Sequence, residues 1–317
     1  MKPQIIKFLP TVVLCLFMTV ISCSEKAKKK SVDENSNRIE DSIANIPEEI
    51  VEPELVINYK IDSLKTSVEL DSFKNKYSDA DQKIIYAINR IEEGRVRAGN
   101  AIVIPDTLLM DLLSYAPFPK KLELLNDIPK TVLISQRVQG FALYENGKLI
   151  KWGPISSGKQ STPTPNGLHY GNYKAREKVS TVDDEWLLPF YFNFMNFEGV
   201  GVHQYALPGY PASHACVRLY MEDATFIYDW AKQWELTSNG RYVHKNGTPF
   251  MVFGEYDYKA DSPWIQLATN NMANELLEAE LKTLQDYKTA YDADEKNVKD
   301  FGDKQKDDLL ALNTKAK

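Results

Sequence analysis

The sequence predicts an α+β fold, with a β-rich domain over residues 131–256, a small α/β unit before it and a helical tail after it. Three observations carry this prediction. Between 131 and 256, short runs of β-branched and aromatic residues alternate with Gly, Pro, Asn and Asp, which is typical of strands and turns. Apolar residues with helical spacing precede this region, and a charged segment with a helical apolar stripe follows it.

Composition narrows the class of protein. The chain has 317 residues, of which 43% are hydrophobic and 26% charged, so it can bury one or two cores and is not wholly disordered. Its 38 basic and 44 acidic side chains give a net charge of −6, and no basic stripe suited to phosphates is present, which argues against nucleic-acid binding. Three cysteines are too few for a disulfide-stapled scaffold.

The first element, residues 1–22, has the pattern of a signal peptide. Lys2 and Lys7 precede an apolar stretch that is shorter than the roughly 20 residues of a membrane-spanning helix. The stretch ends in Val-Ile-Ser-Cys, which resembles the lipobox of bacterial lipoproteins. This resemblance implies export, lipidation of Cys23 and a membrane anchor facing the periplasm and cell envelope. A plain secretory signal or a buried hairpin with an incidental cysteine is the alternative.

Residues 23–58 read as a disordered tether. The stretch from 24 to 56 has no aromatic residue; a lysine cluster is followed by eight acidic residues, so it cannot bury enough apolar area to offset its ordering entropy. A flexible chain of this length has a root-mean-square reach of roughly 30 to 35 Å. We expect it to hold the following domains away from the membrane.

Residues 59–106 form the small α/β unit. Apolar residues at 84, 85, 88 and 91 predict a helix, and the β-branched run that ends at Pro105 predicts a strand. This helix, its loop and the sequence RAGNAIVIP resemble the second half of a LysM module, whereas the first half of such a module is not recognisable. The resemblance implies a contact with peptidoglycan glycan, and a degenerate remnant with a structural role is the alternative.

A connecting helical segment, 107–130, leads into the β-rich domain. The strand-like runs of that domain lie at 131–135, 140–144, 149–152, 168–173 and 249–254. Asn146 and Gly147 predict a tight hairpin turn, because these residues tolerate the positive φ angles that it requires. One helix is expected over 222–233, and the tail over 257–317 has its apolar stripe at 277, 281, 284, 287 and 291.

Cys216 is the residue most suited to chemistry. If Cys15 leaves with the signal peptide and Cys23 is lipidated, Cys216 is the only free thiol, and an exported protein that keeps a free thiol is expected to use it. Two of the four histidines, His203 and His214, lie within thirteen residues of Cys216, and a nearby histidine activates a thiol.

A zinc site is the alternative use of these side chains. It would combine His203, His214 and Cys216 with His169 or His244. Their spacing lacks the paired Cys-x-x-Cys or His-x-x-x-His knuckle of such sites, so the sequence predicts no metal.

Three motifs resemble the L,D-transpeptidase (YkuD-type) catalytic domain of bacterial cell-wall enzymes. They are TPTPNG at 162–167, GVGVH at 199–203 and SHACVRL at 213–219, followed by a helix and the strand GTPFMVFG at 247–254. The resemblance covers about 125 residues. It implies a mixed-sheet β-sandwich with one long helix.

The resemblance also implies roles for individual residues. Cys216 would be the nucleophile and His203 the base, with the Gln204 carbonyl orienting the second nitrogen of His203. The backbone N–H groups of His214, Ala215 and Cys216 would form an oxyanion hole. Ser213 and Arg218 would support the loop or face the substrate.

The activity implied is peptidoglycan L,D-transpeptidation without metal or organic cofactor. The cysteine would form a thioester with a tetrapeptide stem and pass it to an amine, giving a 3-3 cross-link, or to water. Two departures from the family pattern, Ala215 in place of glycine and a short interval between His203 and Cys216, favour an alternative. That alternative is a non-catalytic peptidoglycan-binding lipoprotein with a decayed cleft.

Overall fold

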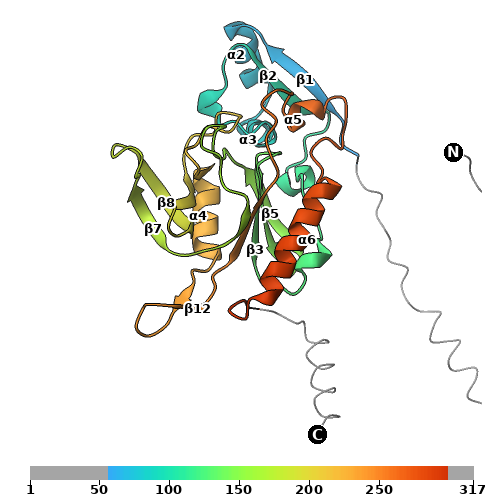
Figure 1. Ribbon diagram of the computed structural model, residues 1–317. Coiled ribbons are helices and arrows are strands. Elements are labelled where there is room, and N and C mark those ends of the chain that lie inside the picture. The colour runs from blue at the N-terminus through green and yellow to red at the C-terminus, as the bar shows by residue number, and fades with distance from the viewer. Residues whose placement is uncertain (1–55, 299–317) are drawn as a thin grey trace, which may run out of the picture. The chain divides into compact units, whose positions relative to one another are not determined.

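The computed structural model describes residues 56–298, shown in Figure 1. The predicted signal peptide, the predicted lipidation site Cys23 and nearly all of the predicted tether therefore lie outside the described residues, as does the end of the predicted tail. Within residues 56–298 the fold is α+β with mixed sheets and few helices, which confirms the predicted fold class. None of the described helices has the length and apolar character needed to span a membrane.

The small unit over 59–105 consists of two helices between two paired strands. Its elements are β1 (Tyr59–Leu64), α2 (Ser67–Lys76), α3 (Asp79–Ile88) and β2 (Asn100–Pro105), with a 3-10 turn at Glu93–Arg95. Both helices start with a capping box, Thr66 with Glu69 and Ser78 with Asp81, in which side chain and backbone satisfy each other reciprocally. The predicted helix and strand of this unit are confirmed, and β1 and α2 are additional. The connecting segment, 107–130, was predicted to be helical, but it contains only two short 3-10 turns, Leu112–Tyr115 and Glu123–Leu125, and no α-helix.

A five-stranded mixed sheet forms the centre of the fold. Its order is β5-β4-β3-β13-β6, and β13 runs parallel to β3 and antiparallel to β6. These strands are β3 (Thr131–Ser135), β4 (Gly140–Glu145), β5 (Lys148–Pro154), β6 (Gly167–Tyr170) and β13 (Pro249–Phe253). All five were predicted. Asn146 and Gly147 join β4 to β5 with φ of 46° and 75°, as the predicted turn requires.

The strands β3 and β13 are buried on both faces. Because side chains alternate across a strand, Leu133 and Met251 join one core, with the helix residue Leu284, whereas Val132 and Phe250 join a second core. Figure 1 shows helix α6 (Glu278–Ala293) on one side of this sheet and helix α4 (Met221–Trp230) on the other. The second core also receives the side chains of a second sheet.

The second sheet has the order β10-β9-β8-β7, with β10 parallel to β9. Its strands are β7 (Lys174–Val179), β8 (Leu187–Met195), β9 (Val200–Gln204) and β10 (Val217–Leu219). A small hairpin, β11 (Glu235–Leu236) and β12 (Val243–Lys245), follows α4, and the short helix α5 (Pro263–Gln266) precedes α6. The two larger sheets enclose the second core as in a sandwich.

Two helix expectations need correction. Helix α4 ends at Trp230 and not at residue 233, because Ala231 has an extended backbone with ψ of 157°. The β-rich domain was expected to contain one long helix, but its helix α4 has only 10 residues. The longest described helix is α6, with 16 residues, and it follows that domain. In the predicted apolar stripe of the tail, Leu284 and Tyr291 are buried, whereas Leu277 and Leu281 are exposed.

Candidate active site

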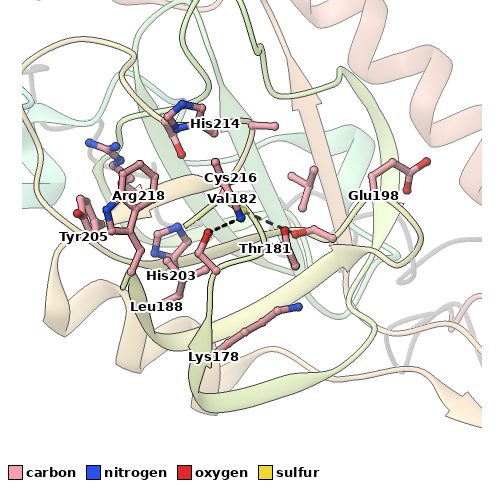
Figure 2. A pocket seen from close by; sticks show the side chains of 16 residues that line it. Lys178, Thr181, Val182, Leu188, Glu198, His203, Tyr205, His214, Cys216 and Arg218 are labelled. Atoms are coloured by element: carbon pink, nitrogen blue, oxygen red, sulfur yellow. Dashed lines mark hydrogen bonds between the residues drawn. The ribbon is translucent and has the colours of Figure 1, made fainter. Parts of the chain in front are cut away.

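A parallel strand pair brings the two principal candidate residues to one edge of the second sheet. His203 lies in β9, and Cys216 immediately precedes β10. The register pairs Val217 with Val202 and Arg218 with His203, so Cys216 lies one residue before the strand that pairs with the histidine's strand. Both side chains line one pocket, together with Arg218, which Figure 2 shows.

His203 is buried, with 3% of its surface exposed, and its tautomer follows from one contact. Its Nδ1 lies 2.9 Å from the carbonyl oxygen of Gln204. A carbonyl oxygen can only accept, so Nδ1 carries the proton and Nε2 is the unprotonated nitrogen. Burial lowers the pKa of His203 to about 4, the Gln204 carbonyl opposes this and the positive charge of Arg218 adds to it. The imidazole is therefore neutral at pH 7 and able to accept a proton.

Cys216 is partly buried, and its Sγ lies 3.7 Å from the carbonyl oxygen of Gly199, to which the thiol donates. Burial raises the pKa of this thiol, and the Gly201 backbone, Lys178 and Arg218 act in the opposite direction. Among residues 56–298 it is the one free cysteine. The resting site thus pairs a neutral thiol with a neutral imidazole.

The segment before Cys216 has an unusual backbone conformation. Ala215 has φ of +78°, in the left-handed region that favours glycine. Its carbonyl accepts a 2.7 Å hydrogen bond from the hydroxyl of Thr164, which in turn accepts from the N–H of Gly158. Within the part of the chain that the structure describes, the N–H groups of His214, Ala215 and Cys216 have no hydrogen-bond acceptor. These three donors are available to a bound oxyanion.

Ser213 and Arg218 hold this loop in place. The N–H of Ser213 donates to Ser157 at 3.0 Å, and its carbonyl accepts from the N–H of Lys159 at 2.8 Å. The Arg218 guanidinium donates to the carbonyl of Ala212 at 3.0 Å and lies 4.6 Å from the centre of the Tyr205 ring. The structure therefore places Arg218 as a brace between the loop and the pocket wall.

The TPTPNG motif lies beside the site, because Thr164 binds the Ala215 carbonyl. Several pocket residues were not predicted from the sequence, among them Lys178, Glu198 and Tyr205. Trp186 packs 5.5 Å from the ring of His214, whose Nε2 lies 2.8 Å from Nζ of Lys159. Lys178 and Trp186 belong to the hairpin of β7 and β8, which the sequence did not predict. Lys178 lies outside the three sequence motifs, and its distance from them along the chain does not indicate that it lines the pocket.

The zinc alternative finds no support in the geometry. Among the described residues, no group of three or more His, Cys, Asp or Glu side chains is placed to hold a metal ion. His169 lies in β6 and packs against Phe194, and His244 is exposed on β12. Neither lines the pocket of His203 and Cys216.

Comparison with known proteins agrees with this arrangement. Residues 129–252 match the family model of the L,D-transpeptidase catalytic domain, YkuD. This range contains both candidate catalytic side chains and, except for Phe253 at the end of β13, all the strands of the two larger sheets. No curated protein matches the sequence.

Several solved structures of L,D-transpeptidases are similar to part of the chain. One from Stackebrandtia nassauensis is 25% identical, with a TM-score of 0.33, over 40% of this chain and 57% of that one. One from Xylanimonas cellulosilytica is 23% identical, with a TM-score of 0.34, over 44% and 66%. An L,D-transpeptidase solved in complex with imipenem is 20% identical, with a TM-score of 0.32, over 39% and 59%. The chain thus spans about three fifths of the length of these proteins.

Proposed function

We propose that the protein is a peptidoglycan L,D-transpeptidase with Cys216 as nucleophile, and the match of residues 129–252 to the L,D-transpeptidase catalytic domain supports this proposal. One observation carries the proposal. A buried histidine with its proton on Nδ1 lies on β9, and a free thiol lies immediately before the parallel strand β10, beside three unpaired backbone N–H groups.

The proposed reaction begins when Sγ of Cys216 attacks the carbonyl carbon that links the third stem residue to the terminal D-Ala. The thiol proton passes to Nε2 of His203, and the carbonyl oxygen becomes an oxyanion that accepts from the loop N–H groups. Each such donor is typically worth about 3 kcal/mol. The C–N bond then breaks, D-Ala leaves with the proton from His203, and a thioester remains on Cys216.

The second half of the reaction reverses the roles. An amine of a neighbouring stem peptide loses its proton to His203 and attacks the thioester, which gives a 3-3 cross-link and restores the thiol. Water in place of the amine gives a shortened stem. Nucleophile, base and oxyanion donors all come from this chain, so the proposed mechanism uses no cofactor.

The location of this reaction is a separate proposal. Lipidation at Cys23 would anchor the chain in the cell envelope, and the β1–α2–α3–β2 unit would contact glycan near the stem peptides. Labelling of the wild type by palmitate, lost in Cys23→Ala, tests the anchor. A soluble and unlabelled wild type would refute it.

Covalent capture tests the nucleophile. The strained lactam carbonyl of imipenem is an acyl donor for a thiol, so intact-protein mass should show one adduct on the wild type and none on Cys216→Ala. His203→Ala should still fold and acylate at least a hundredfold more slowly, because the base is missing. A folded wild type without an adduct would favour the alternative, a non-catalytic protein that binds peptidoglycan.

A further inference from the structure

The pocket contains a cation that the proposed mechanism does not use. We propose that Lys178 is a positioning residue that supplies the positive charge facing the Cys216 sulfur, a role that imidazolium has in many cysteine enzymes. This inference rests on the proposed role of Cys216 as nucleophile. It concerns how the sulfur carries negative charge once its proton has left.

Lys178 is fixed by aromatic contacts. It is the next-to-last residue of β7, and its Nζ lies 4.4 Å from the centre of the Tyr191 ring and 5.0 Å from that of Tyr173. It also donates to the Tyr173 hydroxyl. Two ring faces and one hydroxyl thus hold the ammonium group of Lys178, whose side chain lines the pocket (Figure 2).

A short chain of contacts connects Lys178 with the thiol. Tyr191 is fully buried, and its hydroxyl donates to the carbonyl oxygen of Gly199 at 2.6 Å. The same oxygen accepts the thiol of Cys216 at 3.7 Å. The contacts thus run from the Lys178 ammonium group through the Tyr191 side chain and the Gly199 carbonyl oxygen to the sulfur. Tyr191 holds the Gly199 carbonyl and, with its ring, supports Lys178.

The other cations of the site are already engaged. Arg218 donates to the carbonyl groups of Ala212 and Ala206, and Lys159 lies against His214. Lys178 forms no ion pair with a carboxylate in residues 56–298. Its charge is therefore not neutralised by the protein.

The histidine is poorly suited to the same role. Its lowered pKa, about 4, keeps His203 neutral at pH 7, so the resting site has no imidazolium to face a thiolate. Two cations, Lys178 and Arg218, lower the pKa of the thiol against the effect of burial, and Lys178 has the larger effect. The neighbouring strands and loops all contribute titratable or charged groups around Cys216. These groups are His203, Lys178, Tyr191, Glu198, Tyr205, His214 and Arg218.

The ionisation step balances without any further reactant. The S–H bond breaks, the electron pair stays on sulfur, and the proton goes to Nε2 of His203 during acylation or to water in the resting enzyme. Lys178 keeps its proton throughout. A positive charge in a partly dehydrated pocket acts on the sulfur more strongly than an equal charge in water.

The rate at which iodoacetamide alkylates Cys216 of the full chain, measured from pH 5 to 10, tests the proposal. We expect Lys178→Met to be alkylated about tenfold more slowly at pH 7 and to shift the midpoint upward by about one pH unit. Lys178→Arg keeps the charge and should restore the wild-type midpoint. Arg176→Met is the matched control, since Arg176 is exposed on the same strand and does not line the pocket, and its midpoint should not change.

A wild-type midpoint in Lys178→Met would overturn the proposal, as would a shift of the same size in Lys178→Arg. A merely structural role would lower the limiting rate at high pH without moving the midpoint. Lys178→Gln, which can still donate to Tyr173, provides a second neutral variant if Lys178→Met does not fold. Alkylation needs no peptidoglycan, so this result is independent of whether imipenem acylates the protein.

Discussion

Ala215 has a backbone conformation that favours glycine, with φ of +78°. A non-glycine residue in this region stores strain of roughly 1 kcal/mol. The strain lies next to Cys216, and the Thr164 hydroxyl holds the Ala215 carbonyl. The loop therefore keeps its shape in spite of the side chain.

We expect Ala215→Gly to acylate with imipenem faster, by up to about fivefold, with an unchanged or higher melting temperature. Stopped-flow acylation and thermal unfolding measure the two effects. Ala212→Gly is the control, because Ala212 lies in the same loop without a positive φ and should gain nothing. A slower and less stable Ala215→Gly would show that the loop is adapted to alanine.

The pKa of His203 predicts how the acylation rate changes as the pH is lowered. Burial lowers this pKa to about 4, below the ordinary value of 6.5, so the basic form needed for proton acceptance persists down to about pH 4. The acylation rate at pH 5.5 should therefore stay within about twofold of the rate at pH 7. Initial rates with imipenem from pH 4.5 to 7.5 check this, and a rate that halves near pH 6.5 would contradict it.

At the scale of elements, the sequence predicted those helices and strands whose apolar residues form a clear local pattern. The strands β3 and β13 are continuous apolar runs because both faces are buried, and α3 has a clear apolar face. Strand β7 has four charged residues in six, and α2 buries only Phe73, so neither has a periodic signal. Lys178 lies on β7, which explains why the sequence motifs identified Cys216 and His203 but not this cation.

The turn between β4 and β5 allows a test of whether the hairpin requires glycine at position 147. Gly147 has φ of +75°, and a Cβ there would lie 2.3 Å from Oδ1 of Asn126 and 2.8 Å from the Leu122 carbonyl oxygen. Gly147→Ala should lower the free energy of unfolding by about 2 to 4 kcal/mol, from strain and clash together.

Gly240 is the matched control, since it has a similar φ of +68° with open space around it. Gly240→Ala should cost only about 1 kcal/mol in urea unfolding. Equal losses for Gly147→Ala and Gly240→Ala would show that the clash is relieved by movement of Asn126 and the turn.

At the scale of the whole described molecule, one core joins parts that the sequence divides. It includes Ile88 of α3, Leu133 of β3 and Leu284 of α6. Arg90 lies at the same junction, where its guanidinium is 5.3 Å from the Trp152 ring and 5.0 Å from the Trp264 ring. Such long-range contacts leave no local pattern, so the sequence could not predict them.

We therefore expect residues 56–298 to unfold in one transition, with coincident midpoints from tryptophan fluorescence and far-ultraviolet circular dichroism. Arg90→Ala should lower the stability by about 3 kcal/mol, because it leaves a cavity between two indole rings and an unpaired Val138 carbonyl. The exposed Arg97→Ala should change little. Two separate transitions in the wild type would contradict a shared core.

In the proposed reaction, Cys216 transfers a stem peptide from its terminal D-Ala to the amine of a neighbouring stem peptide or to water. The most direct measurement is mass analysis of the products when the purified protein is incubated with a disaccharide tetrapeptide. We expect free D-Ala together with a 3-3 linked dimer or a shortened stem, and none of these products with Cys216→Ala. Unchanged substrate with a folded protein whose Cys216 still reacts with iodoacetamide would contradict it.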